Sequence, residues 1–209
     1  MLRDIALRSF RERGYDDTTI RLIAQEAGVS VGTTNYHFAS KNHLVQELYL
    51  DVQEAHRDAA LPLLAAEDDL VERLRIVYRT GIDVLEPYHR FAPGFLSAAV
   101  SPKSPINPLS DESAPARDIV EGLFVEAVTG AGRGRVPAEF EERLPQALFL
   151  AHLLLALFWV YDRSDDRART RMLLDRGLGL FKLALPLLKL PLLRGPLREL
   201  LSLVGEVRA

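Results

Sequence analysis

The side chains with the clearest potential for chemistry are polar groups that lie close together between positions 30 and 41. They are hydroxyls, an amide, an imidazole and an ammonium group, and they belong to Ser30, Thr33, Asn35, Tyr36, His37 and Lys41. Hydroxyl, amide and cationic side chains are the groups with which proteins contact the phosphates and base edges of nucleic acid. The chemistry that this stretch indicates is recognition through hydrogen bonds.

Two short helices around a tight turn would hold these groups in place. Along the first helix, apolar residues recur at i, i+3, i+4 and i+7, at Ile20, Ile23, Ala24 and Ala27. Thr19 can cap this helix, Gly28 can take the left-handed conformation that ends it, and Ser30 can cap the second helix. The pattern over residues 19–38 therefore predicts a helix-turn-helix.

The second helix of this motif offers little to a hydrophobic core. Its residues are mostly small or polar: Val31, Gly32, Thr33, Asn35, Tyr36 and His37. In a helix-turn-helix the second helix lies in the major groove of DNA, with its N-terminal residues at the base edges. We therefore expect this helix to be exposed and to contact a partner.

The motif resembles the signature of TetR-family transcriptional regulators. The matching residues are Ile20-Arg21, Ile23-Ala24, Ala27-Gly28-Val29-Ser30, Gly32-Thr33, Tyr36-His37-Phe38 and Lys41 with Leu44. The resemblance implies an all-α fold, with an N-terminal three-helix helix-turn-helix DNA-binding domain and a helical C-terminal ligand-binding and dimerisation domain. It also implies a regulator without a cofactor, usually a repressor, that binds a palindromic operator as a homodimer.

The expected contacts with double-stranded DNA follow from this resemblance. They are Thr19, Ser30, Val31, Thr33, Asn35, Tyr36, His37 and Lys41. Thr33 and Asn35 are the expected base readers, because an asparagine amide suits an adenine edge. The resemblance places Tyr36 and His37 on phosphates and Lys41 on the DNA backbone, although a partly packed position is an alternative for His37.

Two positions of the motif depart from the family pattern. Thr34 stands where an apolar residue is common, and Asn35 stands where a tyrosine is common. We therefore expect a less tightly seated recognition helix that carries a base-reading amide.

The composition is that of an ordinary globular protein. The chain has 209 residues, of which 48% are apolar, and this length allows one or two domains. It has no cysteine, which excludes disulfides, thiolate metal sites and cysteine nucleophiles. The first residues are amphipathic rather than a continuous apolar run, so we expect no signal peptide and a cytoplasmic protein.

The charge balance is unusual for a DNA-binding region. Residues 1–57 carry seven Lys and Arg side chains against eight Asp and Glu side chains, and the whole chain has a net charge of −3. Related regulators often begin with a basic arm, so either that arm is missing or this chain starts downstream of the natural start. We therefore expect binding to depend strongly on dimerisation and on specific contacts.

The domain boundary is expected near residue 57, giving domains 1–57 and 58–209. A first helix with Phe10 in its buried face should end at Gly14, and Ser40 should cap a connector helix that reaches at least Ala60. Pro62 and the acidic residues 67–69 should end the connector and start the fifth helix.

Several features of the C-terminal half follow from composition. A short apolar element is expected over 87–99, and the proline-rich loop 101–115 should border a ligand entrance. Ser113 should cap the next helix, and the glycines of 130–134 should form a flexible linker rather than a phosphate loop.

The most apolar segments are expected to form the homodimer interface. These are the helices around 146–161 and 167–188, the second with Met172, Leu173, Leu180, Phe181, Leu185 and Leu188 on its inner side. The first is apolar all round, which predicts burial on all sides, and it is shorter than the roughly 20 residues that span a membrane. A further amphipathic helix is expected over 194–209.

A small-molecule effector is expected to bind among the fifth to eighth helices and to tilt the connector helix. The candidate pocket residues are Tyr78, Tyr88, Phe95, Phe124, Phe149, His152 and Trp159. Aromatic residues at helical spacing also fill ordinary cores, so packing is the alternative for each.

Two other classes of function are the alternatives to a regulator. An enzyme or a metal site would need catalytic or metal-ligating spacings, but none of the histidines is in a two-ligand helical spacing, and no nucleophile elbow or phosphate loop is present. The sequence therefore assigns no catalytic residue and no metal ligand. The second alternative is a helical interaction protein without operator binding, and the acidic balance of residues 1–57 supports it.

Overall fold

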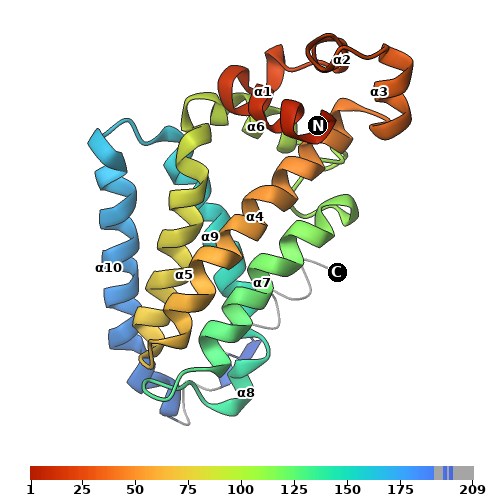
Figure 1. The fold of residues 1–209 in the computed structure, drawn as a ribbon. Helices are drawn as coiled ribbons and strands as arrows, with labels where there is room; N and C mark the ends of the chain where they lie inside the picture. The colour runs from red at the N-terminus through yellow and green to blue at the C-terminus, as the bar shows by residue number, and fades with distance from the viewer. Residues whose placement is uncertain (191–194, 197, 200–209) are drawn as a thin grey trace. The chain divides into compact units, whose positions relative to one another are not determined.

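The computed structural model describes residues 1–190, 195–196 and 198–199, and it confirms the all-α fold class. Within these residues there is no β-strand, only one isolated bridge between Asp69 and Arg133. The helix expected over 194–209 lies almost wholly outside the described residues. The elements (Figure 1) are α1 (Leu2–Asp17), α2 (Ile20–Ala27), α3 (Val31–His37), α4 (Lys41–Ala65), α5 (Leu70–Leu85), η1 (Glu86–Phe91), α6 (Ala92–Ala99), η2 (Asp111–Ser113), α7 (Ala114–Thr129), α8 (Ala138–Glu141), α9 (Leu144–Tyr161), η3 (Asp165–Arg167), α10 (Ala168–Ala184) and η4 (Leu185–Lys189).

The chain divides into two compact units, and neither is continuous in sequence. The first unit comprises Met1–Ala55 and Val84–Asp118, and the second comprises His56–Asp83 and Ile119–Ala209. The helices α4, α5 and α7 each continue from one unit into the other. Compared with the domains expected from the sequence, residues 84–118 are grouped here with the N-terminal helices.

The first unit is built around the buried face of α1. Phe10 is fully buried there, and its ring lies 5.5 Å from the ring of Phe95 in α6. As expected, α1 is interrupted at Gly14, which has a φ of 80°, although one more turn follows as far as Asp17. A Cβ atom at position 14 would lie 2.6 Å from the Phe91 side chain, so only glycine fits against η1.

The end of α4 differs from the expectation. Pro62 lies inside the helix, which continues to Ala65. The helix continues because Leu64 is buried and because the carbonyl oxygens of Leu64 and Glu67 accept hydrogen bonds from the Arg73 guanidinium, at 2.5 and 2.7 Å. The free energy gained from this packing and these hydrogen bonds exceeds the cost of the one backbone N–H donor that proline lacks.

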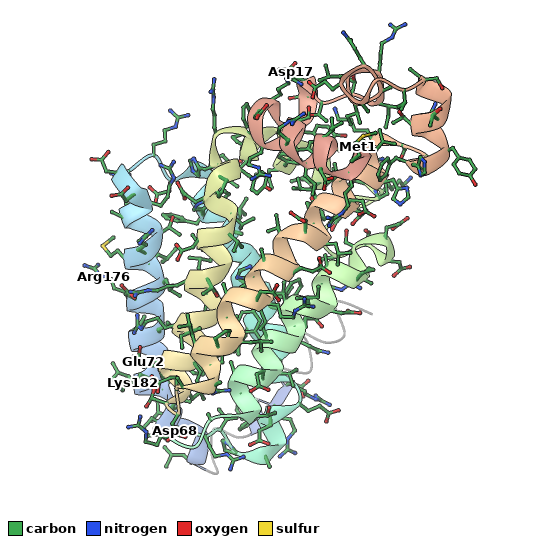
Figure 2. All side chains as sticks on the ribbon, in the orientation of Figure 1. Met1, Asp17, Asp68, Glu72, Arg176 and Lys182 are labelled. Atoms are coloured by element: carbon green, nitrogen blue, oxygen red, sulfur yellow. The ribbon has the colours of Figure 1, made fainter. Side chains whose placement is uncertain are left out.

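The acidic residues before α5 act as helix caps. The Asp69 carboxylate accepts hydrogen bonds from the backbone N–H groups of Val71 and Glu72, and the Glu67 carboxylate accepts two more from the adjacent backbone. Asp68 lies in the turn before α5, and Glu72 lies in the first turn of α5. Glu72 is near the end of α10 that carries Lys182 (Figure 2). A structural role at the helix start is confirmed.

Two further expectations need correction. Ser110, not Ser113, accepts the capping bond ahead of α7, while the Ser113 hydroxyl bonds the Gln46 side chain. The glycine run 130–134 is not a free linker, because the N–H groups of Gly132 and Arg133 both donate to the Asp68 carbonyl at 3.1 Å.

The apolar helices of the second unit each keep one side exposed. In α9 the buried residues include Leu148, Leu155 and Trp159, so burial on all sides is wrong within one chain. In α10 the buried face is Thr170, Leu174 and Leu178 rather than the expected inner side. The exposed apolar residues of the two helices are Leu154, Leu157, Phe158, Tyr161, Met172, Leu173, Leu180 and Leu183.

In the expected inner face of α10, Phe181 and Leu185 are half-buried, and the side chain of Leu188 lies outside the described residues. By length and composition α9 also meets the criteria for a membrane-spanning helix, as core helices of other proteins do. Within the residues described it is the one helix that does so.

Candidate nucleic-acid interface

Hydrogen bonds define the turn between α2 and α3. The Thr19 hydroxyl accepts from the Leu22 N–H at 3.1 Å and so caps α2, and Gly28 ends this helix with φ 68° and ψ 27°. The Val29 N–H donates to the Ala24 carbonyl at 3.0 Å, and the Ser30 hydroxyl accepts from the Thr33 N–H at 3.0 Å. The predicted helix-turn-helix is confirmed with its caps.

The helix α3 presents nearly all of its side chains to solvent, as expected. Its one buried residue is Thr34, which is fully buried, whereas Tyr36 is 88% exposed. The Thr34 hydroxyl donates to the Ser30 carbonyl at 3.3 Å, which satisfies a polar group where an apolar one is common. The helix is therefore held against the unit by one residue of α3 and by its flanking residues.

The polar groups of α3 differ in how far they are already engaged. The hydroxyls of Ser30 and Thr33 lie 2.9 Å apart and bond to each other, so Thr33 is part of the cap. The Asn35 amide is exposed and bonds no described residue. The rings of Tyr36 and His37 meet edge to face at 5.5 Å, and both are exposed, so the partly packed alternative for His37 is wrong.

Lys41, at the start of α4, makes contacts within the protein. Its ammonium lies 3.9 Å from the centre of the Tyr15 ring and donates to the Asp16 carbonyl at 3.4 Å. Burial lowers the pKa of Lys41, while the carboxylates of Asp16 and Asp17 oppose that shift. This lysine joins the start of α4 to the end of α1, a role that the sequence did not reveal.

Most cations of residues 1–57 are paired internally. Arg3 binds Glu47 at 2.9 Å, and Arg8 and Arg13 both bind Glu26. The hydrogen bond from Arg13 is the main reason that the pKa of Glu26 is lowered. Arg21, on the exposed side of α2, forms no ion pair with a described residue, and it is not among the contacts expected from the sequence.

The candidate effector residues fall into two groups. Tyr78, Phe124, Phe149, His152 and Trp159 are buried in the second unit. The rings of Tyr78 and Phe124 are 5.0 Å apart, and each lies 6.0 Å from the His152 ring. Tyr88 and Phe95 instead pack against the core of the first unit, so the structure does not bring them to the same place.

Two histidines lie side by side in the core of the second unit. The rings of His56 and His152 are stacked 6.0 Å apart, and His56 Nε2 lies 2.9 Å from the Val77 carbonyl. Burial lowers the pKa of His56 to about 4 and that of His152 to about 3. The Nδ1 atom of His152 is buried and has no hydrogen-bond partner among the described residues.

Gly81 makes room for this pair. A Cβ atom there would lie 2.6 Å from one His152 ring carbon and 2.9 Å from one His56 ring carbon. Glycine within a helix costs about 1 kcal/mol relative to alanine. At this position α5 requires glycine because the two imidazoles occupy the space of a side chain.

The proline-rich loop 101–115 borders a cavity of about 480 Å³ within the first unit. The loop is anchored to α4, since Gln46 donates to the Pro105 carbonyl and Tyr49 to the Ile106 carbonyl. The lining residues are Ser40, Asn42, His43, Gln46, Glu47, Leu50, Pro105, Glu112, Pro115 and Ala116. The use of this cavity as a ligand entrance stays a prediction.

The described residues contain no cluster of three or more His, Asp or Glu side chains suited to a metal ion. A capped helix-turn-helix, with an exposed polar second helix on an all-α chain, defines the class of helix-turn-helix transcriptional regulators.

Comparison with known proteins identifies the family. The chain matches the tetracyclin repressor-like C-terminal domain over residues 73–204 and the bacterial regulatory proteins of the tetR family over residues 2–48. The first match alone covers more than half of the chain, so this chain belongs to the TetR family.

Individual relatives are matched over shorter stretches. The HTH-type transcriptional repressor KstR2 of Mycobacterium tuberculosis is 35% identical over 92 residues, which is 42% of this chain and 44% of KstR2. An uncharacterized HTH-type transcriptional regulator of the same species is 47% identical over 47 residues, and this chain spans 22% of its length. The crystal structure of a TetR transcriptional regulator from Nitrosomonas europaea, 17% identical, shares the fold with a TM-score of 0.62 over 86% of this chain and 94% of that one.

Proposed function

We propose that this chain is a cytoplasmic, ligand-responsive repressor that binds a palindromic double-stranded DNA operator as a homodimer. The observation that carries the proposal is α3, whose side chains are exposed and polar apart from Thr34 and Val31. KstR2 is named a repressor, which favours repression over activation. The DNA contacts are those expected from the sequence, to which we add Arg21 as a phosphate contact because it is exposed on α2 and forms no ion pair with a described residue.

The second copy is proposed to cover the exposed apolar faces of α9 and α10. Leu154 and Leu183 are 66% and 74% exposed, a cost that burial against the same residues of a partner would remove. Gly177 and Gly179 have open space at their Cβ positions, so another helix can approach α10 closely. Two copies would place two α3 helices at half-sites about 34 Å apart, or at a multiple of that distance.

The effector is proposed to be a neutral, largely apolar molecule with one hydrogen-bond donor. The residues that would surround it are aromatic, and the Nδ1 atom of His152 can accept one hydrogen bond there. Arg73 is buried in the same unit, but its guanidinium is already bonded to four backbone carbonyls and to Glu126. A charged ligand would therefore lack a counter-ion, and burying an unpaired charge is costly.

Ligand binding in the second unit is proposed to release DNA because α4 runs continuously from the first unit into the second. The ligand must bind the DNA-competent and released states with different affinities, since equal affinities shift nothing. We propose no catalytic activity for this chain.

Operator binding is tested by selecting duplexes from a random pool with the full chain, followed by gel shift at moderate salt. A palindrome is the expected result. A dimer that selects no sequence would instead favour the alternative of a helical interaction protein, which the internally paired cations of residues 1–57 support.

Contact residues are tested by Tyr36→Ala, which should weaken operator binding and leave the dimer intact. Tyr36 is 88% exposed and outside the core, so this change should not alter the fold. Loss of the dimer in this variant would mean that the interface has been misplaced.

A further inference from the structure

The amide of Asn35 is the most available base-reading group on α3. The Ser30 and Thr33 hydroxyls are bonded to each other, and Thr34 is buried. The Asn35 amide is exposed and engaged with no described residue, so it can offer a donor and an acceptor side by side. On the major-groove edge adenine presents a complementary acceptor and donor, N7 and N6, whereas guanine presents two acceptors.

Val31 is an exposed apolar residue on an otherwise polar surface. It is 42% exposed, so packing in the core of the chain accounts for only part of its side chain. It cannot bond a phosphate. In the major groove the apolar feature is the 5-methyl group of thymine. An exposed valine on a DNA-reading helix therefore matches a thymine methyl.

Val31 and Asn35 are four residues apart and lie on the same face of α3. Four residues advance a helix by about 6 Å. Successive base pairs of DNA are about 3.4 Å apart. One face of α3 thus reaches two bases that are one or two base-pair steps apart.

We propose that each half-site contains an adenine bonded by Asn35 and, one or two base pairs away, a thymine whose methyl group contacts Val31. This inference rests on the proposed DNA-binding function. It reassigns Thr33, which the sequence predicted to read a base, to holding the start of α3 through the Ser30–Thr33 bond.

The test combines protein variants with modified bases in the selected palindrome. Replacing the adenine by 7-deazaadenine removes the N7 acceptor, and replacing the thymine by deoxyuridine removes only the methyl group. For the unaltered dimer the first change should weaken binding by about 5-fold per half-site, the value of one hydrogen bond. The second should weaken it by about 4-fold, the value of one buried methyl group.

The matched variants separate the two contacts. Asn35→Ala should no longer respond to 7-deazaadenine but should still respond to deoxyuridine, and Val31→Ala should show the reverse. Both positions are exposed on α3, and thermal melting serves as the check that each variant is folded. An adenine outside the half-sites, replaced in the same way, is the control for the modification itself.

Two results would overturn the inference, and they are distinguishable. A dimer that selects no palindrome refutes the proposed function and the base assignment together. A dimer that selects a palindrome but is insensitive to both modified bases, or whose variants respond as the unaltered protein does, refutes the base assignment alone.

Discussion

The helices α3 and α9 both have one buried and one exposed face, but their exposed faces differ in chemistry. In α3 the buried residue is a threonine, and the exposed groups include an amide, a phenol and an imidazole. In α9 the buried face holds His152 and Trp159, and the exposed face is apolar, with Leu154 and Tyr161. Exposure alone therefore says little. The type of exposed group is the basis for our proposals that α3 faces DNA and that α9 faces another protein surface.

The largest expected effect comes from placing charge on the exposed apolar face beside α9. Leu180→Glu combined with Leu183→Glu on α10 would bury two carboxylates in the proposed interface, where they lack partners. We expect monomers by analytical ultracentrifugation. Operator affinity should fall by about 100-fold or more, because binding through two sites is lost.

Val125→Glu is the matched control for this substitution, since Val125 is also an exposed apolar residue but lies on α7. It should leave the dimer and operator binding unchanged. A dimer that persists in the α10 double variant would show that α10 does not face the partner.

The next effect is the pH dependence of stability that arises from His152, on the buried face of α9, and its neighbour His56 on α4. The folded protein lowers the pKa of His56 to about 4 and of His152 to about 3, from 6.5. Below pH 6.5 the unfolded chain therefore binds more protons. The contribution of the two neutral imidazoles to the free energy of unfolding is fully present above that pH. It is lost as the pH falls towards 4, by about 1 kcal/mol per pH unit for each imidazole.

Urea unfolding between pH 8 and pH 4.5 measures this dependence. The variant His152→Asn, which cannot titrate, should show about half of the slope. A slope equal to that of the unaltered protein would mean that the acid sensitivity arises elsewhere in the chain.

A steric change beside the same two histidines should have a smaller effect on stability. Gly81→Ala brings a methyl group against both imidazoles, and overpacking of this kind costs about 1–3 kcal/mol of the free energy of unfolding. Gly122→Ala in α7 is the control, because its Cβ has open space, and it should stabilise by about 0.5–1 kcal/mol. If both variants were equally stable in urea unfolding, the two imidazoles would have to move aside easily.

The smallest effect is expected at the buried residue of α3. Thr34→Val removes a hydroxyl whose acceptor, the Ser30 carbonyl, also receives the Thr34 N–H at 3.1 Å. No buried acceptor is left unpaired, so the free energy of unfolding should rise by about 0.5 kcal/mol, with unchanged operator affinity. A loss of affinity at equal stability would show that the hydroxyl sets the position of α3 on DNA.

Local sequence signals predicted the helix-turn-helix closely. Thr19, Gly28 and Ser30 act within a few residues of where they stand, so their roles as caps and turn could be read directly from the chain. The acidic cap at Asp69 follows the same rule. These contacts are decided by neighbours in sequence.

The contacts that sequence reasoning missed join residues far apart in the chain. Lys41 binds Tyr15 and Asp16 of α1, and Arg73 holds the ends of α4 and α7. Nothing in the spacing of these residues reveals their partners. The same reason explains why Tyr88 and Phe95 could not be separated from the other aromatic candidates, since only the path of the chain places them against α1.

The close fit of Gly14 against Phe91 has a consequence for the construction of chimaeras between related regulators. The first unit, which carries the helix-turn-helix, is assembled from two separate stretches of chain, Met1–Ala55 and Val84–Asp118. A chimaera that grafts residues 1–57 alone onto another sensor would leave Phe10 and Tyr15 without the Phe95 ring. Exchange of DNA specificity between relatives should therefore succeed by substitutions on α3, and fail by transplanting the N-terminal segment as a module.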